Sequence, residues 1–332
     1  WKLEEEEMNS RCRQQALIAG AVLGGLVLRS LWKRWTQRPT GPIAPVLITG
    51  CDTGFGNLLA RDLAKDGWEV FAGCFTAQGC DALNKVDNVF AFRLDVGSEE
   101  SVKAAGELIR SKTSTLHAIV NNAGISDGWL MDLTSLARFR HTFEINLLGV
   151  ISVTKTFWRL CGASDNGRIV NIASVAGRVA GPGGSGYSAS KFAVEGFSDA
   201  IRRELAGFGV RVCIVEPGCF RTNIWDAIGA VKQIVADNPK ESLDIYGPEF
   251  IAQHTDVDFI KNKLEGLMQD PEKVVRALRH AVTSRRPNTR YSVGWDAKVL
   301  FLPLAYAPTW LSDALWRKLL QAGAVRPVGF KK

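Results

Sequence analysis

The chain has 332 residues, and its 41 Lys and Arg against 34 Asp and Glu give a formal net charge of +7. Hydrophobic residues make up 46% and charged residues 23%, which is ordinary globular usage and excludes the disordered and fibrous classes. The seven cysteines form no CxxC pair and the four histidines are dispersed, so neither a disulfide scaffold nor a metal site is expected. The sequence contains no run rich in Lys and Arg, so it does not indicate nucleic-acid binding.

The N-terminal part divides into a polar tail and an apolar run. Residues 1–15 are mostly polar, and Ala16–Leu28 carries no charge. A helix over that run rises about 20 Å, less than the roughly 30 Å of a bilayer core, but continuing it through Trp32 and Trp35 lengthens it. Tryptophan beside Lys and Arg is typical of a membrane boundary. We therefore predict a polar tail over 1–15 and a membrane anchor helix over 16–35.

Two other interpretations of the apolar run stay open, namely a cleaved signal peptide and an ordinary buried helix. A signal peptide usually carries its positive charges before the apolar run, whereas the larger basic cluster here follows it, in 29–38. This order favours a retained anchor, with the basic residues that follow the apolar run on the cytoplasmic side of the membrane. If Met8 is the natural start, Arg11 and Arg13 precede the run and weaken that asymmetry.

A proline-containing linker over 36–45 leads into a region where short β-branched runs alternate with longer amphipathic segments. The expected strands are Val46–Thr49, Trp68–Cys74, Val89–Leu94, Ala118–Asn121, Ile169–Ile172 and Val210–Val215. The expected helices are Leu58–Lys65, Ser98–Arg110, Leu136–Leu160 and Lys191–Leu205. This alternation predicts one α/β domain over 46–298, a Rossmann-type, doubly wound parallel sheet in a three-layer α/β/α arrangement.

A glycine-rich loop follows the first expected strand. Residues 50–56 read GxxxGxG before a helix. Gly50 permits a tight turn, Gly54 lets the backbone approach a pyrophosphate, and Gly56 lets the helix pack closely on the sheet. Free N–H groups at a helix N-terminus favour phosphate. The loop therefore predicts a dinucleotide site, although a turn without a ligand can look the same.

Further motifs follow the later strands in a fixed order. They are Asn121-Asn122-Ala123-Gly124, Asn146, Ser174, the YxxxK sequence from Tyr187 to Lys191, Pro217-Gly218 and Thr222. This ordered set resembles the short-chain dehydrogenase/reductase family over about residues 46–290. The sequences TGCDTGFGNLLA, FAGC and PLAYAPTWLSD are similar to the membrane-bound retinol/hydroxysteroid dehydrogenase branch of that family.

The resemblance implies catalysis by Asn146, Ser174, Tyr187 and Lys191. Tyr187 takes the hydroxyl proton as hydride leaves carbon, but an unperturbed phenol titrates near 10. Lys191 lies one helical turn away, so its ammonium, with the positive charge of oxidised nicotinamide nearby, is expected to lower that pKa. Ser174 hydrogen-bonds the reacting oxygen, so Ser174 and Tyr187 are the expected substrate-binding residues. In the family, Asn146 holds a water that links Lys191 to solvent, and Lys191 binds the nicotinamide ribose.

The expected cofactor is NAD, with NADP as the alternative. An NADP-binding relative would carry Arg or Lys after the second strand or just before Gly54, where this chain has Thr76 and Thr53. Asp52 also disfavours a further phosphate beside the loop, and branch members with this loop favour NAD. The implied cofactor-binding residues are Thr49, Gly50, Asp52, Thr53, Gly54, Phe55, Gly56, Asp95, Val96, Asn122, Ala123, Gly124, Tyr187, Lys191, Pro217, Gly218 and Thr222.

The branch acts on hydrophobic alcohols, so the resemblance implies interconversion of retinol or a hydroxysteroid with its aldehyde or ketone. Residues 222–271 are expected to form an apolar lid over the substrate, or else a helix packed on the core. The apolar segment 299–332 is expected to pack on the core, or to contact lipid and shape the substrate entrance. Membrane association follows, at the endoplasmic reticulum or alternatively the mitochondrial inner membrane.

Three alternative functions remain beside this one. D-3-hydroxybutyrate dehydrogenase shares the loop and FAGC, but it needs polar or cationic residues for a carboxylate, and the sequence does not locate them. A nucleotide-binding scaffold without chemistry would usually lack Tyr or Lys of the catalytic set, and both are present here. The third alternative is a soluble cytosolic reductase. The resemblance also implies a homodimer paired through two long helices.

Overall fold

The structure is a computed structural model that describes residues 44–164, 166–222, 228–256, 265–321 and 328. At its centre is a seven-stranded parallel sheet with the order β3-β2-β1-β4-β5-β6-β7. The strands are β1 (Val46–Thr49), β2 (Val70–Cys74), β3 (Val89–Arg93), β4 (Ala118–Asn121), β5 (Arg168–Ile172), β6 (Arg211–Pro217) and β7 (Arg290–Val293). The order reverses between β1 and β4, which is where such a sheet binds ligands.

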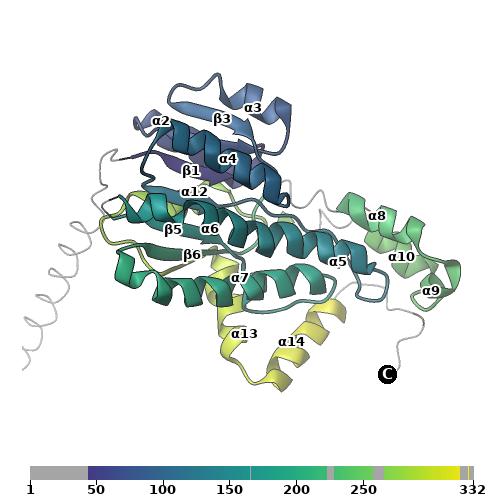
Figure 1. Ribbon diagram of the computed structural model, residues 1–332. Coiled ribbons are helices and arrows are strands. Elements are labelled where there is room, and N and C mark those ends of the chain that lie inside the picture. The colour runs from purple at the N-terminus through teal and green to yellow at the C-terminus, as the bar shows by residue number, and fades with distance from the viewer. Residues whose placement is uncertain (1–43, 165, 223–227, 257–264, 322–327, 329–332) are drawn as a thin grey trace, which may run out of the picture.

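Helices cover both faces of the sheet, which confirms the predicted three-layer fold (Figure 1). They are α2 (Gly54–Lys65), α3 (Ala77–Leu83), α4 (Glu99–Lys112), α5 (Leu136–Phe143), α6 (Gly149–Gly162), α7 (Ser185–Glu204) and α12 (Glu272–Thr283). Buried side chains of α2 and α12 form one apolar core with the sheet, and those of α4, α6 and α7 form the other. Because both faces are covered, strands such as β1 and β4 are apolar and buried along their whole length.

The predicted strands are confirmed to within a few residues, but four elements differ from expectation. The edge strand β7 and the short helix α3 were not expected. Helix α7 begins at Ser185, six residues before the predicted start at Lys191, so Tyr187 lies in its first turn. The expected helix 136–160 is interrupted by a π-helical turn, Glu144–Leu148, between α5 and α6.

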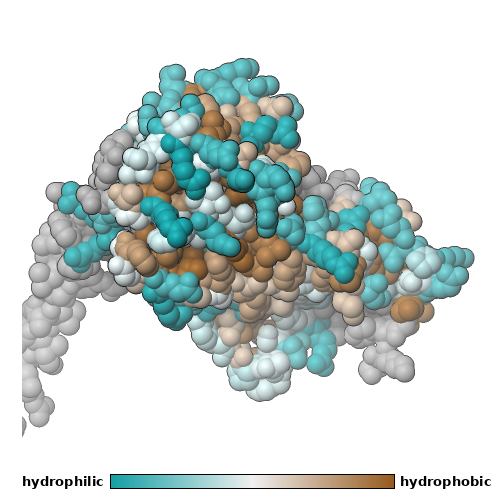
Figure 2. Space-filling model, in the orientation of Figure 1, coloured by the Kyte–Doolittle hydropathy of each residue, from teal (hydrophilic) through white to brown (hydrophobic). Residues whose placement is uncertain are grey.

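Apolar side chains gather on the outer face of α6 and α7 (Figure 2). Leu148 on the π-helical turn and Phe192 on α7 are among the exposed large hydrophobic residues. Exposed apolar area of this kind favours an interface with another protein surface. The predicted homodimer through these helices would cover it and stays a prediction.

The two ends of the chain are only partly described. The predicted tail, the anchor helix over 16–35 and most of the linker lie outside the described residues. Among the helices that are described, none is long and apolar enough to cross a membrane. At the other end, α13 (Leu302–Tyr306) and α14 (Thr309–Gln321) fold back beside α7 (Figure 1).

The predicted lid corresponds to a small helical cluster and two segments outside the described residues, 223–227 and 257–264. The cluster consists of α8 (Ile228–Asp237), α9 (Lys240–Asp244) and α10 (Pro248–Thr255). It has its own apolar core, in which Phe250 stacks on Trp129 of the loop after β4. This core holds the cluster beside the carboxyl end of the sheet.

Candidate active site

A cavity of about 740 Å³ lies along the carboxyl ends of β1, β2, β4, β5 and β6. Its wall combines the glycine loop, the loop after β4, Ser174, Tyr187, Lys191 and the turn after β6. The cavity includes the switch point between β1 and β4, because residues that follow both strands line the cavity. The fold therefore brings motifs that are far apart in the sequence to one cleft.

The glycine loop after β1 is held closed by the loop after β4. Gly50 has a positive φ of 67°, and a side chain there would lie 2.7 Å from the Ala123 backbone. The Asn122 amide donates to the carbonyls of Thr49 (2.9 Å) and Gly50 (2.8 Å). The Thr49 hydroxyl in turn accepts from the backbone N–H of Asn122 and Ala123. The two loops thus form one rigid unit at the switch point.

Helix α2 leaves its N-terminal donors available to a ligand. Its N-cap, Thr53, makes no side-chain capping bond, and its first turn carries no acidic residue. Gly54, the first helical residue, has a φ of 63°, and the nearest atoms to an added side chain are those of Thr222 at 3.9 Å. A helix start of this kind stabilises negative charge through its free N–H groups and its dipole. The residues present therefore fit the pyrophosphate of a dinucleotide.

Asp52 joins the glycine loop to the end of β2. Its carboxylate accepts from the backbone N–H of Phe75 (2.7 Å) and Thr76 (2.8 Å) and from the Thr76 hydroxyl (2.6 Å). Thr76 is also the N-cap of α3. A fixed negative charge consequently lies at the edge of the cleft, beside the end of the second strand.

The turn after β6 is fixed by a residue that the sequence analysis did not select. Asp296, which is fully buried, accepts from the backbone N–H of Cys219 (2.6 Å) and from the Gln269 amide (2.7 Å). A side chain on Gly218 would lie 2.2 Å from the Asp296 carboxylate. Close approach of this carboxylate therefore explains glycine at position 218, next to Pro217 in the cavity wall.

Ser174, Tyr187 and Lys191 converge on the cavity from β5 and α7. Burial raises the pKa of the Tyr187 phenol, and the nearby Ser174 hydroxyl acts against that rise. The Lys191 ammonium lies 5.7 Å from the centre of the Tyr187 ring and donates to the Ile172 carbonyl at 2.9 Å. The two side chains are one turn apart on α7, as the YxxxK spacing predicts.

Burial shifts the pKa values of Tyr187 and Lys191 in this trio. Burial raises the pKa of Tyr187 to about 12, against the expected lowering by Lys191. Burial also lowers the pKa of Lys191 to about 8. Both shifts disfavour the charged form because a buried charge loses solvation. Without a ligand, burial therefore favours the neutral phenol of Tyr187.

Asn146 lies in the π-helical turn behind the cavity wall and is fully buried. Its side chain accepts from the N–H of Ile125 (2.8 Å) and donates to the Ile125 carbonyl (2.9 Å) and the Ser190 hydroxyl (3.0 Å). Both amide hydrogens are therefore engaged, and Asn146 fixes the loop after β4 against α7. π-Helical turns inside α-helices are frequent at functional sites.

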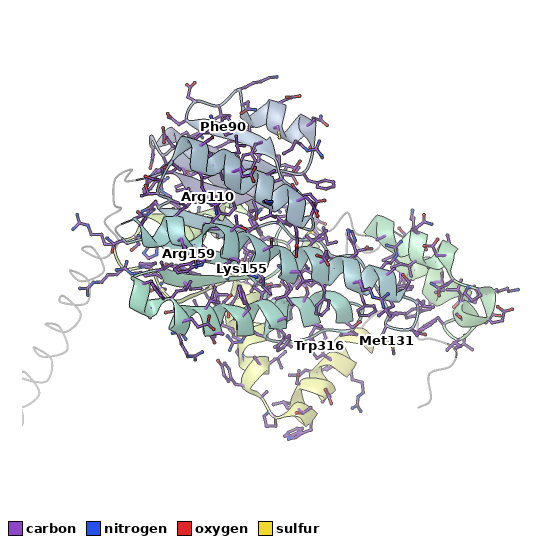
Figure 3. The ribbon with its side chains drawn as sticks, viewed as in Figure 1. Phe90, Arg110, Met131, Lys155, Arg159 and Trp316 are labelled. Atoms are coloured by element: carbon purple, nitrogen blue, oxygen red, sulfur yellow. The ribbon has the colours of Figure 1, made fainter. Side chains whose placement is uncertain are left out.

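An apolar wall closes the cavity on the side away from the glycine loop. Phe301 and Trp316 line it from the C-terminal segment, and their rings stack with centroids 6.3 Å apart. Trp316 lies on the side of α14 that faces the α/β body (Figure 3), 3.0 Å from where a side chain on Gly181 would begin. The prediction that the C-terminal segment shapes an apolar entrance therefore has contacts that support it.

The predicted site residues divide into those that line the cavity and those that support it. Thr49, Gly56 and Asn146 lie behind the wall, whereas the other predicted residues line it, including Asp95, Val96 and Phe55. Of the predicted lid, Thr222 lines the cavity and the described helices α8 to α10 do not. The sequence analysis missed Ser126, His141 and Val179, which occur in no motif, so no sequence signal could have identified them.

The chain is similar to known proteins over most of its length. The profile of the short chain dehydrogenase family matches residues 44–233. Retinol dehydrogenase 7 of Mus musculus is 39% identical over 289 residues, covering 84% of this chain and 90% of the relative. The 17-beta-hydroxysteroid dehydrogenase type 6 of Bos taurus is 43% identical over 291 residues, covering 83% and 90%. Retinol dehydrogenase 5 of Homo sapiens is 40% identical over 306 residues, covering 89% and 94%.

Two solved structures share the fold. A short-chain dehydrogenase from Streptomyces avermitilis superimposes with a TM-score of 0.65 at 26% identity, covering 84% of this chain and 98% of that one. A short chain dehydrogenase from Burkholderia cenocepacia, solved in complex with NADP, gives a TM-score of 0.63 at 22% identity with the same coverage. The family profile and these relatives show that the chain belongs to the short-chain dehydrogenase family and is an NAD(P)-dependent alcohol dehydrogenase.

Proposed function

We propose that the protein is an NAD-dependent dehydrogenase that interconverts a hydrophobic alcohol, retinol or a hydroxysteroid, and its aldehyde or ketone. The convergence of Ser174, Tyr187 and Lys191 on a cavity with an apolar wall is the observation that carries this proposal. The names of the relatives, retinol dehydrogenases and a 17-beta-hydroxysteroid dehydrogenase, support the substrate class.

In the proposed mechanism each side chain of the trio has a separate task. Ser174 hydrogen-bonds the substrate oxygen and stabilises its developing charge. Tyr187 takes the hydroxyl proton during oxidation and returns it during reduction. When bound, oxidised nicotinamide would accept the hydride and would add a second positive charge near the phenol, beside that of Lys191. Lys191 holds its ammonium next to Tyr187 and so stabilises the phenolate.

Asn146 has a supporting task in this mechanism. Because its amide hydrogens are engaged by Ile125 and Ser190, a water there would bind the free lone pair of Oδ1 or the backbone carbonyl of residue 146. Gly124 leaves room beside it, since a side chain at that position would lie 3.3 Å from Asn146 Oδ1 and 3.5 Å from Lys191 Nζ. The space left by Gly124, between Asn146 and Lys191, favours a proton path from Lys191 to solvent.

Asp52 supports NAD over NADP. The end of the second strand is where doubly wound folds distinguish a ribose hydroxyl from a 2′-phosphate. Asp52 places a negative charge there, and a second negative group nearby costs free energy. Arg93, which pairs in register with Cys74 at the end of β2, does not line the cavity.

Turnover of apolar alcohols with both cofactors tests the proposal. We expect NADH formation from retinol or androstanediol and none from D-3-hydroxybutyrate, with kcat/KM at least about tenfold higher for NAD than for NADP, about 1.4 kcal/mol. The substitution Asp52→Asn removes the charge and should narrow this preference. Silence with all three alcohols and both cofactors would instead support a non-catalytic scaffold.

Membrane association is part of the same proposal. Val299, Tyr306 and Trp310 are exposed on the C-terminal segment next to the cavity wall, and Lys298 and Arg317 lie close to them in the sequence. Aromatic residues interspersed with basic ones suit a lipid–water interface. An apolar substrate could then enter the cavity directly from lipid.

Washing of membranes from cells that express the full chain tests this association. We expect the protein to stay with the membranes through high salt and to be released by detergent, because apolar burial is not screened by salt. The double substitution Val22→Glu and Leu26→Glu should shift it to the salt-soluble fraction, whereas Ser10→Glu in the polar tail should not. Release of the unaltered protein by salt alone would support a soluble reductase.

A further inference from the structure

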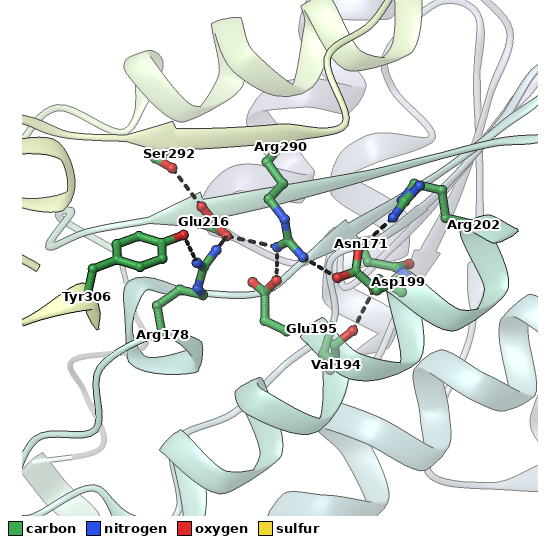
Figure 4. Close-up of polar contacts among 11 residues, drawn as sticks. Asn171, Arg178, Val194, Glu195, Asp199, Arg202, Glu216, Arg290, Ser292 and Tyr306 are labelled. Carbon is green, nitrogen blue, oxygen red and sulfur yellow. Dashed lines mark hydrogen bonds and ion pairs between the residues drawn. The ribbon is translucent and has the colours of Figure 1, made fainter. Parts of the chain in front are cut away.

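A partly buried cluster of charged side chains joins α7, the helix that carries Tyr187 and Lys191, to β6 and β7. Glu195 and Asp199 follow Lys191 on α7 at intervals of one turn, and Glu216 on β6 and Arg290 on β7 face them. Figure 4 shows Arg290 between the three carboxylates. Glu216 is 1% exposed and Glu195 is 7% exposed, so both carboxylates are removed from solvent.

One guanidinium is shared among these carboxylates. Arg290 contacts Glu195 directly, and its nitrogens lie 3.0 Å from Glu216 and 2.8 Å from Asp199. Glu216 has further partners, because Arg178 and Ser292 donate to it at 2.9 and 2.6 Å. Asp199 is additionally paired with Arg202 at 3.3 Å. Among the described residues, Arg290 is the one cation that forms a direct ion pair with Glu195.

The remaining oxygen of Glu195 is left without a partner. Among the described residues no hydrogen bond reaches its buried Oε1. An uncompensated buried carboxylate is costly unless a cation balances its charge. The cation one turn earlier on the same helix is Lys191, which is 4% exposed and donates to the neutral Ile172 carbonyl.

The charges of Glu195 and Lys191 depend on each other. Burial lowers the pKa of Lys191, whereas the negative charge of Glu195 raises it, with a result of about 8. Burial raises the pKa of Glu195 to about 7, with Arg290 and Arg178 acting against that shift and Glu216 adding to it. A negative charge on Glu195 therefore favours the ammonium form of Lys191, and the cations beside Glu195 favour its carboxylate form.

We propose that Glu195, paired with Arg290, is a positioning residue whose negative charge, one helical turn from Lys191, helps to keep Lys191 charged beside Tyr187. The inference rests on the proposed catalytic roles of Tyr187 and Lys191. In this proposal Arg290 on β7 holds the Glu195 carboxylate, and that carboxylate supports the positive charge of Lys191.

The variant Glu195→Gln tests this role, with Asp199→Asn as the matched control. Both substitutions remove one carboxylate from Arg290, but only the first removes the charge behind Lys191. We expect the alkaline fall of kcat for NADH formation to move to lower pH by about one unit in Glu195→Gln, because Lys191 loses its proton earlier. The profile of Asp199→Asn should match that of the unaltered protein.

Other outcomes separate the possible failures. If both variants lost the same activity and their pH profiles of kcat did not shift, the charged cluster would have only a structural role. That result would overturn the inference. If Glu195→Gln does not fold, Glu195→Asp should give a smaller shift in the same direction, and an unshifted profile there would also overturn it. An active Tyr187→Phe protein would instead refute the catalytic roles on which the inference rests.

Discussion

Replacing Tyr187 with Phe should reduce turnover by about 10²- to 10⁴-fold, the range that a positioned proton-transfer group contributes. The substitution removes only the phenolic oxygen, which lies near the Ser174 hydroxyl. The ring that lies 5.7 Å from the Lys191 ammonium stays in place. Affinity for NAD should therefore change little, while kcat falls. Steady-state NADH formation together with NAD titration by fluorescence separates these two effects.

Tyr246→Phe is the matched control for that experiment. Tyr246 lies between α9 and α10, donates to Asp132 and does not line the cavity. It loses an exposed hydrogen bond of modest value, so activity should be kept. Comparable losses in both variants would mean that the phenol of residue 187 has no special task, and turnover retained by Tyr187→Phe would refute its role in proton transfer.

Replacing Gly56 with Ala should weaken NAD binding by at least about tenfold, or 1.4 kcal/mol. The added carbon would lie 2.5 Å from the Asn122 amide nitrogen and 2.6 Å from the Gly50 carbonyl oxygen. These are the two groups that hold the glycine loop closed, so the loop has to move. Alanine would otherwise favour the helix by up to about 1 kcal/mol. Calorimetric NAD titration and thermal melting measure both consequences.

The control for this substitution is another helical glycine. Gly196 lies within α7, and nothing is within 4 Å of the position of its added carbon. Gly196→Ala should therefore raise stability slightly, by roughly 0.5–1 kcal/mol, and leave NAD binding unchanged. If Gly56→Ala bound NAD as tightly as this control, the close contact between the two loops would not be what shapes the cofactor site.

The sequence predicts the sheet and the cofactor loop because both depend on local signals. Runs such as Val46–Thr49 are buried on two faces and are therefore apolar throughout. Gly50 and Gly54 have positive φ angles, which other residues rarely adopt, so glycine marks the turn directly. The spacing of Tyr187 and Lys191 equals one helical turn, and that period alone places them on one face.

Other features depend on contacts between distant segments and leave no local signal. Arg168 would be taken for a surface charge at a strand end, yet it is fully buried and donates to the carbonyls of Ala281 and Ser284. Asp296 fixes a turn that lies 77 residues earlier in the chain. Burial raises the pKa of Tyr187 in the protein without cofactor, and burial cannot be read from the spacing of Tyr187 and Lys191.

The ionisation of Tyr187 in the NAD-bound protein tests the central claim most directly. The difference in ultraviolet absorbance between the unaltered protein and Tyr187→Phe, recorded against pH with saturating NAD, isolates the phenolate of this residue. We predict that its pKa falls from about 12 without cofactor to well below 10 with NAD, through the added positive charge and Lys191. A phenolate that appears only above pH 10 in the NAD-bound protein would contradict the proposal that Tyr187 is the proton acceptor.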